Sequence, residues 1–128
     1  MGVIKKRGIT YAGGGGADGV DYSTTEQKTG RKWIDGKDVY IRTSPNHHTV
    51  LPYNETLVDT GIEVTGDIIA VYGSILRDGE PINFGGAFSN VIYSRWMVRN
   101  NKLYASVNGM SNETYSINYI TAEYTHAS

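Results

Sequence analysis

The chain has 128 residues, with 12 basic and 13 acidic side chains and a net charge of −1. This length suits one compact domain. The charge balance leaves no large basic field for a nucleic acid backbone, so we expect no nucleic acid partner. Cysteine is absent, which excludes disulfide bonds, zinc held by thiolates and a cysteine nucleophile.

The N-terminus lacks the apolar core of a signal peptide, and no apolar run approaches the ~20 residues of a membrane span. We therefore expect a protein made without a signal peptide and not inserted into a membrane. The composition includes 16 glycines and 10 tyrosines, with many Val, Ile and Thr residues that favour a pleated, half-buried surface. No segment has a sustained apolar period of 3.6, so we expect almost no helix.

Residues 1–20 are predicted to form a short extended N-terminal arm with a glycine-rich linker, ahead of one domain over residues 21–128. Residues 12–19 include four consecutive glycines, which carry no side chain to pack and lose the most entropy on ordering. Such a run is typical of a linker. A phosphate-binding loop is the alternative, but the Gly-Lys-Ser/Thr that it requires does not follow.

From residue 21 onward the sequence predicts short strands separated by turn signals. Residues 44–56 contain two prolines and two asparagines and are predicted to form a loop. Many short strands at such intervals indicate an all-β fold, namely an antiparallel, jelly-roll-like β-sandwich. The predicted strands cover residues 25–34, 37–43, 57–58, 62–64, 67–76, 80–84, 90–99, 102–107 and 114–125.

Alternation along the strands predicts which side chains face the core. In the strand over residues 90–99, Ile92, Trp96 and Val98 share one side. The apolar phase changes along the last strand, so we expect a β-bulge near Tyr119-Ile120. The side chains predicted to fill the space between the sheets are Ile69, Val71, Trp96, Leu103 and Ile117.

Asp35-Gly36 lies between two apolar-rich runs and predicts a β-hairpin over residues 31–43. A two-residue turn would pair Ile34 with Lys37, whereas a three-residue turn with a bulge at Gly36 would shift the pairing by one. The sequence does not choose between these registers. Trp33 is expected to pack at the edge of the core, because burial of an indole removes a large apolar area from water.

The segment GRKWIDGKDVYIRT, residues 30–43, resembles a tryptophan-led hairpin in small structural proteins of tailed bacteriophages and prophages of Gram-positive gut bacteria. Those proteins carry Glu-x-x-x-Gly-x-Trp-x-Asp-Gly-Lys-x-x-Tyr, and the matching residues here are Glu26, Gly30, Trp33, Asp35, Gly36, Lys37 and Tyr40. The start of the chain is similar to a second feature of that family, through Ile4, Lys5, Gly8, Ile9 and Tyr11. Residues 58–62 and Tyr124-Thr125 also fit, whereas Asp38 stands where the family often has proline.

The resemblance implies a virion part, such as a tail, baseplate or fibre-associated protein, built as a β-sandwich and often trimeric. It implies assembly with copies of the chain and with other virion proteins, and synthesis in the bacterial cytoplasm before entry into the virion. It implies no catalytic residues, and we expect no cofactor. We also expect no metal site, because the adjacent side chains of His47 and His48 would point opposite ways in an extended segment.

A carbohydrate-binding module that recognises host-surface glycans is the alternative function, since Trp and Tyr rings have apolar faces and polar tips that suit sugars. The same side chains could instead belong to the core, to strand edges or to contacts between subunits. The candidate ligand or interface aromatics are Trp33, Tyr40, Tyr53, Tyr72, Tyr93 and Tyr104.

Overall fold

A computed structural model describes residues 21–87 and 92–127, and these residues form eight strands. The described residues include no helix, and thus none that could cross a membrane. The arm and linker predicted for residues 1–20 lie outside the described residues. The strands are β1 (Gln27–Lys32), β2 (Asp38–Thr43), β3 (Val58–Glu63), β4 (Ile68–Arg77), β5 (Glu80–Asn83), β6 (Tyr93–Arg99), β7 (Lys102–Asn108) and β8 (Tyr115–Tyr124).

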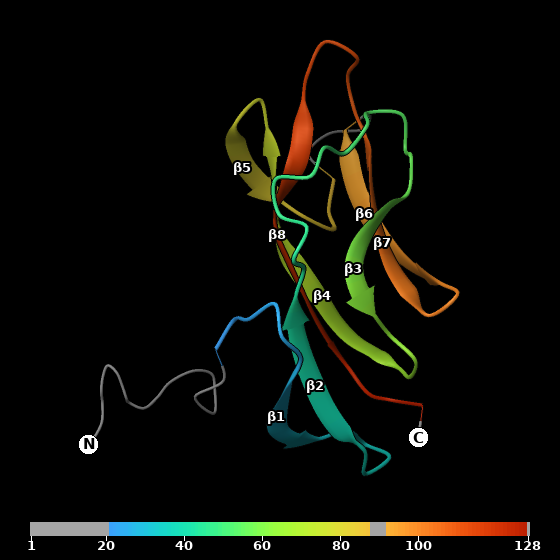
Figure 1. Ribbon diagram of the computed structural model, residues 1–128. Coiled ribbons are helices and arrows are strands. Elements are labelled where there is room, and N and C mark those ends of the chain that lie inside the picture. Colours follow the sequence, from blue (N-terminus) through green and yellow to red (C-terminus); the bar gives the residue numbers. More distant parts are fainter. Residues whose placement is uncertain (1–20, 88–91, 128) are drawn as a thin grey trace, which may run out of the picture.

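The strands form two antiparallel sheets that pack against each other, which confirms the predicted β-sandwich (Figure 1). The larger sheet has the order β1-β2-β8-β4-β5 and the smaller has the order β3-β7-β6. The pairs β2–β8 and β3–β7 are nested in the sequence, so strands from the two halves of the chain lie side by side in both sheets. Residues 44–56 form the loop between β2 and β3 and contain no strand, as the prolines and asparagines predict.

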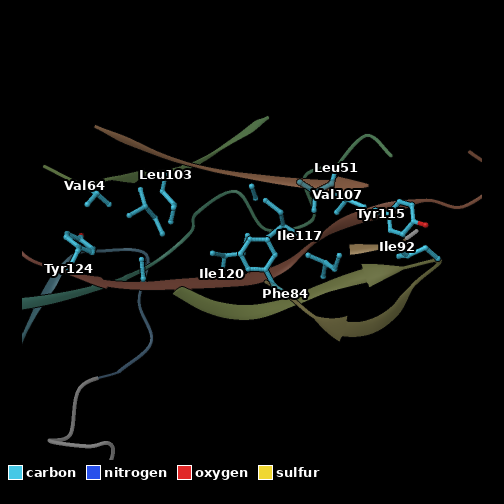
Figure 2. Packing of buried hydrophobic residues seen from close by; sticks show 14 residues of the cluster. Leu51, Val64, Phe84, Ile92, Leu103, Val107, Tyr115, Ile117, Ile120 and Tyr124 are labelled. Carbon is cyan, nitrogen blue, oxygen red and sulfur yellow. The ribbon is translucent and has the colours of Figure 1, made fainter. Parts of the chain in front are cut away.

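The core lies between the sheets and receives side chains from both (Figure 2). Leu103 and Ile117 are fully buried there, as predicted, and Val71 is partly buried against the same cluster. Leu51 is 1% exposed and belongs to the core although it comes from the connecting loop. Ile69 is partly buried and lies where the pairing of β4 with β8 shifts, so it is not part of the cluster.

The bulge predicted in the last strand is present, one residue before the expected pair. Ser74 pairs with Tyr119 and Ile75 pairs with Ile117, so Asn118 is the extra residue of β8. Its side-chain amide donates to Ser74 Oγ at 2.7 Å. The bulge lets residues of both parities face inward, because Ile117 lies before it and Ile120 after it, and both are fully buried.

Trp96 was expected in the core, and this prediction is wrong. Its side chain is 38% exposed and that of Val98 is 39% exposed, although Ile92 is buried. The residues that pair with them on β7, Ala105 and Leu103, are fully buried. The difference arises because β6 is the last strand of the smaller sheet, so its inner side chains are covered by a neighbouring strand on one side only.

The predicted hairpin forms, and it adopts the three-residue turn with a bulge at Gly36. Trp33 N–H donates to Lys37 O and Gly36 N–H donates to Trp33 O, both at 2.9 Å. Gly36 has a φ of 86°, a value that glycine reaches without steric strain and that this turn requires. The Asp35 carboxylate also accepts a bond from Lys37 N–H at 3.0 Å, which holds the tip in place.

The expected contact of Trp33 with the core is wrong. The indole is partly buried, yet it belongs neither to the core cluster nor to the partly buried side chains that pack against it. The last paired residues of the hairpin strands are Lys32 and Asp38, so Trp33 lies in the turn beyond them. Figure 1 shows this hairpin at the end of the larger sheet, past the smaller sheet that covers the core.

Candidate functional site

The six candidate aromatics are spread over the turn of the β1–β2 hairpin, the β2–β3 loop and four strands, and no two of their rings contact one another in the part of the chain described. Tyr53, in the loop, is 44% exposed, and the other five are partly buried. The predicted residues therefore do not form one common platform. Their positions are the turn for Trp33, β2 for Tyr40, β4 for Tyr72, β6 for Tyr93 and β7 for Tyr104.

Two of these tyrosines use their hydroxyl groups to hold the fold. Tyr72 donates to Glu123 Oε2 at 2.9 Å, while Arg31 Nη2 donates to Glu123 Oε1 at 3.0 Å, so one carboxylate joins β1, β4 and β8. Burial and the bond to Glu123 raise the pKa of Tyr72 well above its ordinary value. A hydrogen bond to Glu55 likewise raises the pKa of Tyr93. Both hydroxyls are therefore protonated donors at neutral pH.

Tyr40 is the candidate that lies within a wider cluster of aromatic and charged side chains. The His126 ring stacks on Tyr40 with 3.8 Å between the ring centroids and 10° between the planes. Tyr124 pairs with Tyr40 across β2 and β8, and their rings are 6.5 Å apart. The Tyr124 and His126 rings are 6.2 Å apart, so the three rings form a compact cluster in which His126 stacks on Tyr40, at the end of the larger sheet beside the hairpin.

Glu26 is the charged partner of this cluster. Its Oε1 accepts a hydrogen bond from Tyr124 Oη at 2.7 Å and lies 3.0 Å from His126 Nε2. Partial burial acts to raise the pKa of Glu26, but the bonds from His126 and Tyr124 outweigh it and hold this pKa below its usual range. Burial, and then the bond to Glu26, raise the pKa of Tyr124 far above its ordinary value. The carboxylate is therefore ionised and the phenol is protonated at neutral pH.

An open cleft of about 540 Å³ lies on one side of His126, lined by Glu26, Arg42, Glu63, Thr65, His126 and Ala127. Arg42 Nε donates to Thr24 O at 2.7 Å, which fixes the guanidinium at the rim. Ala127 N–H donates to Thr65 Oγ1 at 3.1 Å and holds the segment after β8 against the cleft. The arrangement brings carboxylates, a guanidinium and an imidazole to one space, which are groups that can bind a polar ligand.

The chain matches no protein-family model, and no curated protein or solved structure is significantly similar to it.

His47 and His48 are both exposed, as predicted for a loop. Their side chains do not point opposite ways, because the backbone is not extended there: His48 has a φ of 66° and the two ring centroids are 4.7 Å apart. Over residues 21–87 and 92–127, no three His, Asp or Glu side chains lie close enough together to hold a metal ion.

Glu26 and His126 were not recognised as a pair from the sequence, in which 100 positions separate them. Glu26 lies just before β1 and His126 just after β8, so they meet only because β2 lies between these strands in the sheet. The one available signal was Tyr40, which shares the motif with Glu26 and shares the stack with His126. Alternation within a single strand carries no information about such a long-range contact.

Proposed function

We propose that this chain is a non-enzymatic structural protein of a bacteriophage or prophage virion, associated with the tail, the baseplate or a fibre. What supports the proposal is the tryptophan-led hairpin, the segment that resembles proteins of this class. Its turn presents Ile34 at the tip, with 90% of the side chain exposed. Single exposed apolar residues are common, but this one is fixed by the turn hydrogen bonds within the segment that carries the resemblance.

In this function the hairpin tip contacts a neighbouring virion protein, and the β-sandwich serves as the body that positions it. The protein is made in the bacterial cytoplasm, assembles with copies of itself and with other virion proteins, and contacts the host surface once it is part of the particle. The resemblance implies trimers, which we expect only within the assembled particle.

Purified particles from bacteria that carry the gene test this function. We expect mass spectrometry to find the chain in intact particles, and deletion of the gene to leave particles that lack a tail component. Ile34→Glu should prevent incorporation, whereas Val50→Glu, at an exposed position away from the hairpin, should not. Complete and infectious particles from the deletion strain would refute the proposal.

A second candidate function is the recognition of a host-surface glycan, and the stack of Tyr40 and His126 beside the cleft favours it. A sugar ring binds through an apolar face and through hydroxyl groups that bond carboxylates and guanidinium groups, and Glu63 and Arg42 line the same cleft. In this version the ligand site is the cleft that His126 lines. None of the six candidate aromatics lines it, and Tyr40 acts on it only by stacking on the His126 ring.

A glycan array with the isolated protein tests this second function. Any binding should be lost in His126→Ala and kept in Tyr53→Ala, which removes an exposed ring that lies in the β2–β3 loop. A ligand that binds His126→Ala as well as the unaltered protein would exclude the cleft.

A further inference from the structure

The edges of the two sheets differ in how they are protected against pairing with another strand. Exposed edges are sites of intermolecular pairing unless bulges, prolines, charges or covering segments block them. In the larger sheet, β1 carries a bulge at Gly30 and exposed Lys28 and Lys32, and β5 is short and contains Pro81. Both of these edges carry blocking features.

The β3 edge of the smaller sheet is also closed. The pairing of β3 with β7 shifts between Asp59 and Glu63. Two β3 carbonyl oxygens accept side-chain bonds from the loop, Asp59 O from Asn46 Nδ2 at 3.0 Å and Thr60 O from Ser44 Oγ. The loop thus occupies positions that a further strand would need.

β6, at the other edge of the smaller sheet, carries exposed Arg95 and Arg99, but among the described residues no bulge, proline or covering segment blocks it over most of its length. It pairs with β7 at every position from Tyr93 to Arg99 without a register shift, and it contains neither glycine nor proline. Ser94 N–H donates to Gly86 O at 3.0 Å, which closes only the start of the free edge. From Arg95 to Arg99 no described strand pairs with this edge.

The free stretch of β6 has the hydrogen-bonding groups and the apolar side chains that a partner strand requires. Because Ser94 N–H points away from β7, alternation points the N–H groups of Trp96 and Val98 to the same free edge. Their side chains lie on one face and are 38% and 39% exposed. An incoming strand would therefore gain backbone bonds and cover both side chains at once.

We propose that the partner is a second copy of this chain, with the two β6 strands pairing antiparallel around a two-fold axis at Met97. In this register Trp96 of each copy lies opposite Val98 of the other, so the two exposed apolar side chains cover each other twice. The smaller sheets of the two copies then form one continuous sheet. The proposal specifies a partner for the assembly function proposed above and rests on it.

The residues at the two ends of the free stretch favour this register over the two alternatives with the axis at Trp96 or at Val98. An axis at Trp96 would place Val98 of the second copy opposite Ser94, where Gly86 already lies. An axis at Val98 would place Trp96 opposite Asn100, a turn residue with a φ of 53°. Only the axis at Met97 uses the whole stretch from Arg95 to Arg99.

The charges are also compatible with this pairing, because the Glu55 carboxylate lies beside Arg95, the residue that Arg99 of the second copy would face. The register brings Arg99 of the second copy opposite Arg95, and two like charges alone would oppose the contact. Glu55 Oε2 lies 3.5 Å from Arg95 Nη2 and carries the opposite charge. The Glu55 carboxylate of one copy therefore lies near Arg99 of the second copy. The two-fold axis repeats this contact, so it occurs twice in the dimer.

Sedimentation equilibrium tests the dimer, with protein from about 1 µM to about 1 mM, since pairing through five residues of one strand is expected to bind weakly. We expect the average mass to rise towards two chains. Val98→Lys should prevent this rise, whereas Val50→Lys, the same change at a site that is 67% exposed in the β2–β3 loop, should dimerise normally. A monomer at every concentration, or a dimer that persists in Val98→Lys, would overturn the proposal.

A single cysteine tests the register, because the chain has none of its own. Opposed residues at a non-hydrogen-bonded antiparallel position have Cα atoms about 4.5 Å apart, within the range for a disulfide. Met97→Cys should cross-link under mild oxidation at least ~10-fold faster than Arg95→Cys. Equal rates would exclude the axis at Met97. If the protein dimerises in solution but is absent from virions, only the proposed function is contradicted. If it is found in virions but does not dimerise, only the β6 pairing is contradicted.

Discussion

β1 and β3 each contain a Thr-Gly pair, and both pairs form the same irregularity in different surroundings. The register shifts by two residues in each strand, around Gly30 with a φ of 85° and Gly61 with a φ of 83°. Each threonine hydroxyl donates to a carbonyl of the neighbouring strand and accepts the N–H of the residue after the glycine. The distances are Thr29 Oγ1–Val39 O 2.9 Å, Arg31 N–Thr29 Oγ1 3.1 Å, Thr60 Oγ1–Leu103 O 2.7 Å and Ile62 N–Thr60 Oγ1 3.3 Å.

The two bulges differ in what surrounds the glycine. A Cβ at Gly30 would meet nothing within 4 Å, whereas a Cβ at Gly61 would lie 3.0 Å from Pro45 Cγ. The loop that closes the β3 edge supplies this contact, while the β1 bulge lies open at the edge of the larger sheet. The two bulges share the same threonine hydrogen bonds, so we expect the neighbouring chain to determine how much a substitution at each glycine destabilises the fold.

The largest effect is expected from Gly61→Ala. The left-handed backbone and the overlap with Pro45 together should lower the free energy of unfolding by about 3 kcal/mol. Urea denaturation measures the change. Adding Pro45→Ala should recover about 1 kcal/mol, because it removes the overlap and leaves the backbone strain. If the second substitution recovers nothing, the overlap is not the cause.

A smaller loss, about 2 kcal/mol, is expected from Thr60→Val, which keeps the shape and removes the hydroxyl. The buried Leu103 O and the Ile62 N–H then both lack their partner. Thr60→Ser should stay within about 1 kcal/mol of the unaltered protein, since it retains both bonds. Thermal unfolding of the three proteins decides the point, and equal losses for Val and Ser would assign the effect to packing.

Gly30→Ala should destabilise less than Gly61→Ala, by about 1 kcal/mol. Its φ of 85° strains any residue with a Cβ, but open space surrounds the position. The same urea measurement applies. A loss as large as that of Gly61→Ala would show that the backbone angle, and not the neighbouring loop, sets the effect at both bulges.

The smallest effect is expected from acid, and it belongs to the β1 side of the molecule. The pKa of Glu26 is lowered in the folded state by its bonds from His126 and Tyr124, so this stabilisation is complete above the unfolded pKa, about 4.3. It is lost as the pH falls through the folded value. Urea midpoints measured from pH 7 to pH 3 should fall less steeply for Glu26→Gln than for the unaltered protein. Parallel curves would show that Glu26 contributes nothing to acid sensitivity.

The sequence predicted the features that depend on neighbouring residues along the chain. Alternation placed Leu103 and Ile117 inside, and Asp35-Gly36 located the hairpin, because both signals are local. Thr-Gly shows the limit of such signals. The dipeptide also occurs at Thr65-Gly66, where the glycine has no positive φ and instead lies close to the backbone of Thr125. Whether a Thr-Gly dipeptide forms a bulge therefore depends on the residues that surround it in space.

Exposure and long-range pairing could not be predicted in this way. Alternation along β6 places Trp96 on the side of the strand that faces the core. Only the order of the strands shows that β6 is at the edge of its sheet, where this side chain stays exposed. The contact between Glu26 and His126 likewise depends on the position of β2 beside β8. The trimer and the virion role remain predictions, since the resemblance alone carries them.

The central place of β8 has a consequence for how the protein is made. β8 follows every other described strand in the chain, yet it lies between β2 and β4 and joins the two halves of the larger sheet. A nascent chain leaves the ribosome from its N-terminus, so the larger sheet cannot close until residue 124 has emerged. Folding should therefore be delayed until after synthesis of the strands, as expected for a fold dominated by distant contacts. Ribosome-bound chains that stop before residue 115 should be cleaved readily by protease, whereas chains in which residue 124 has cleared the ribosome should resist it.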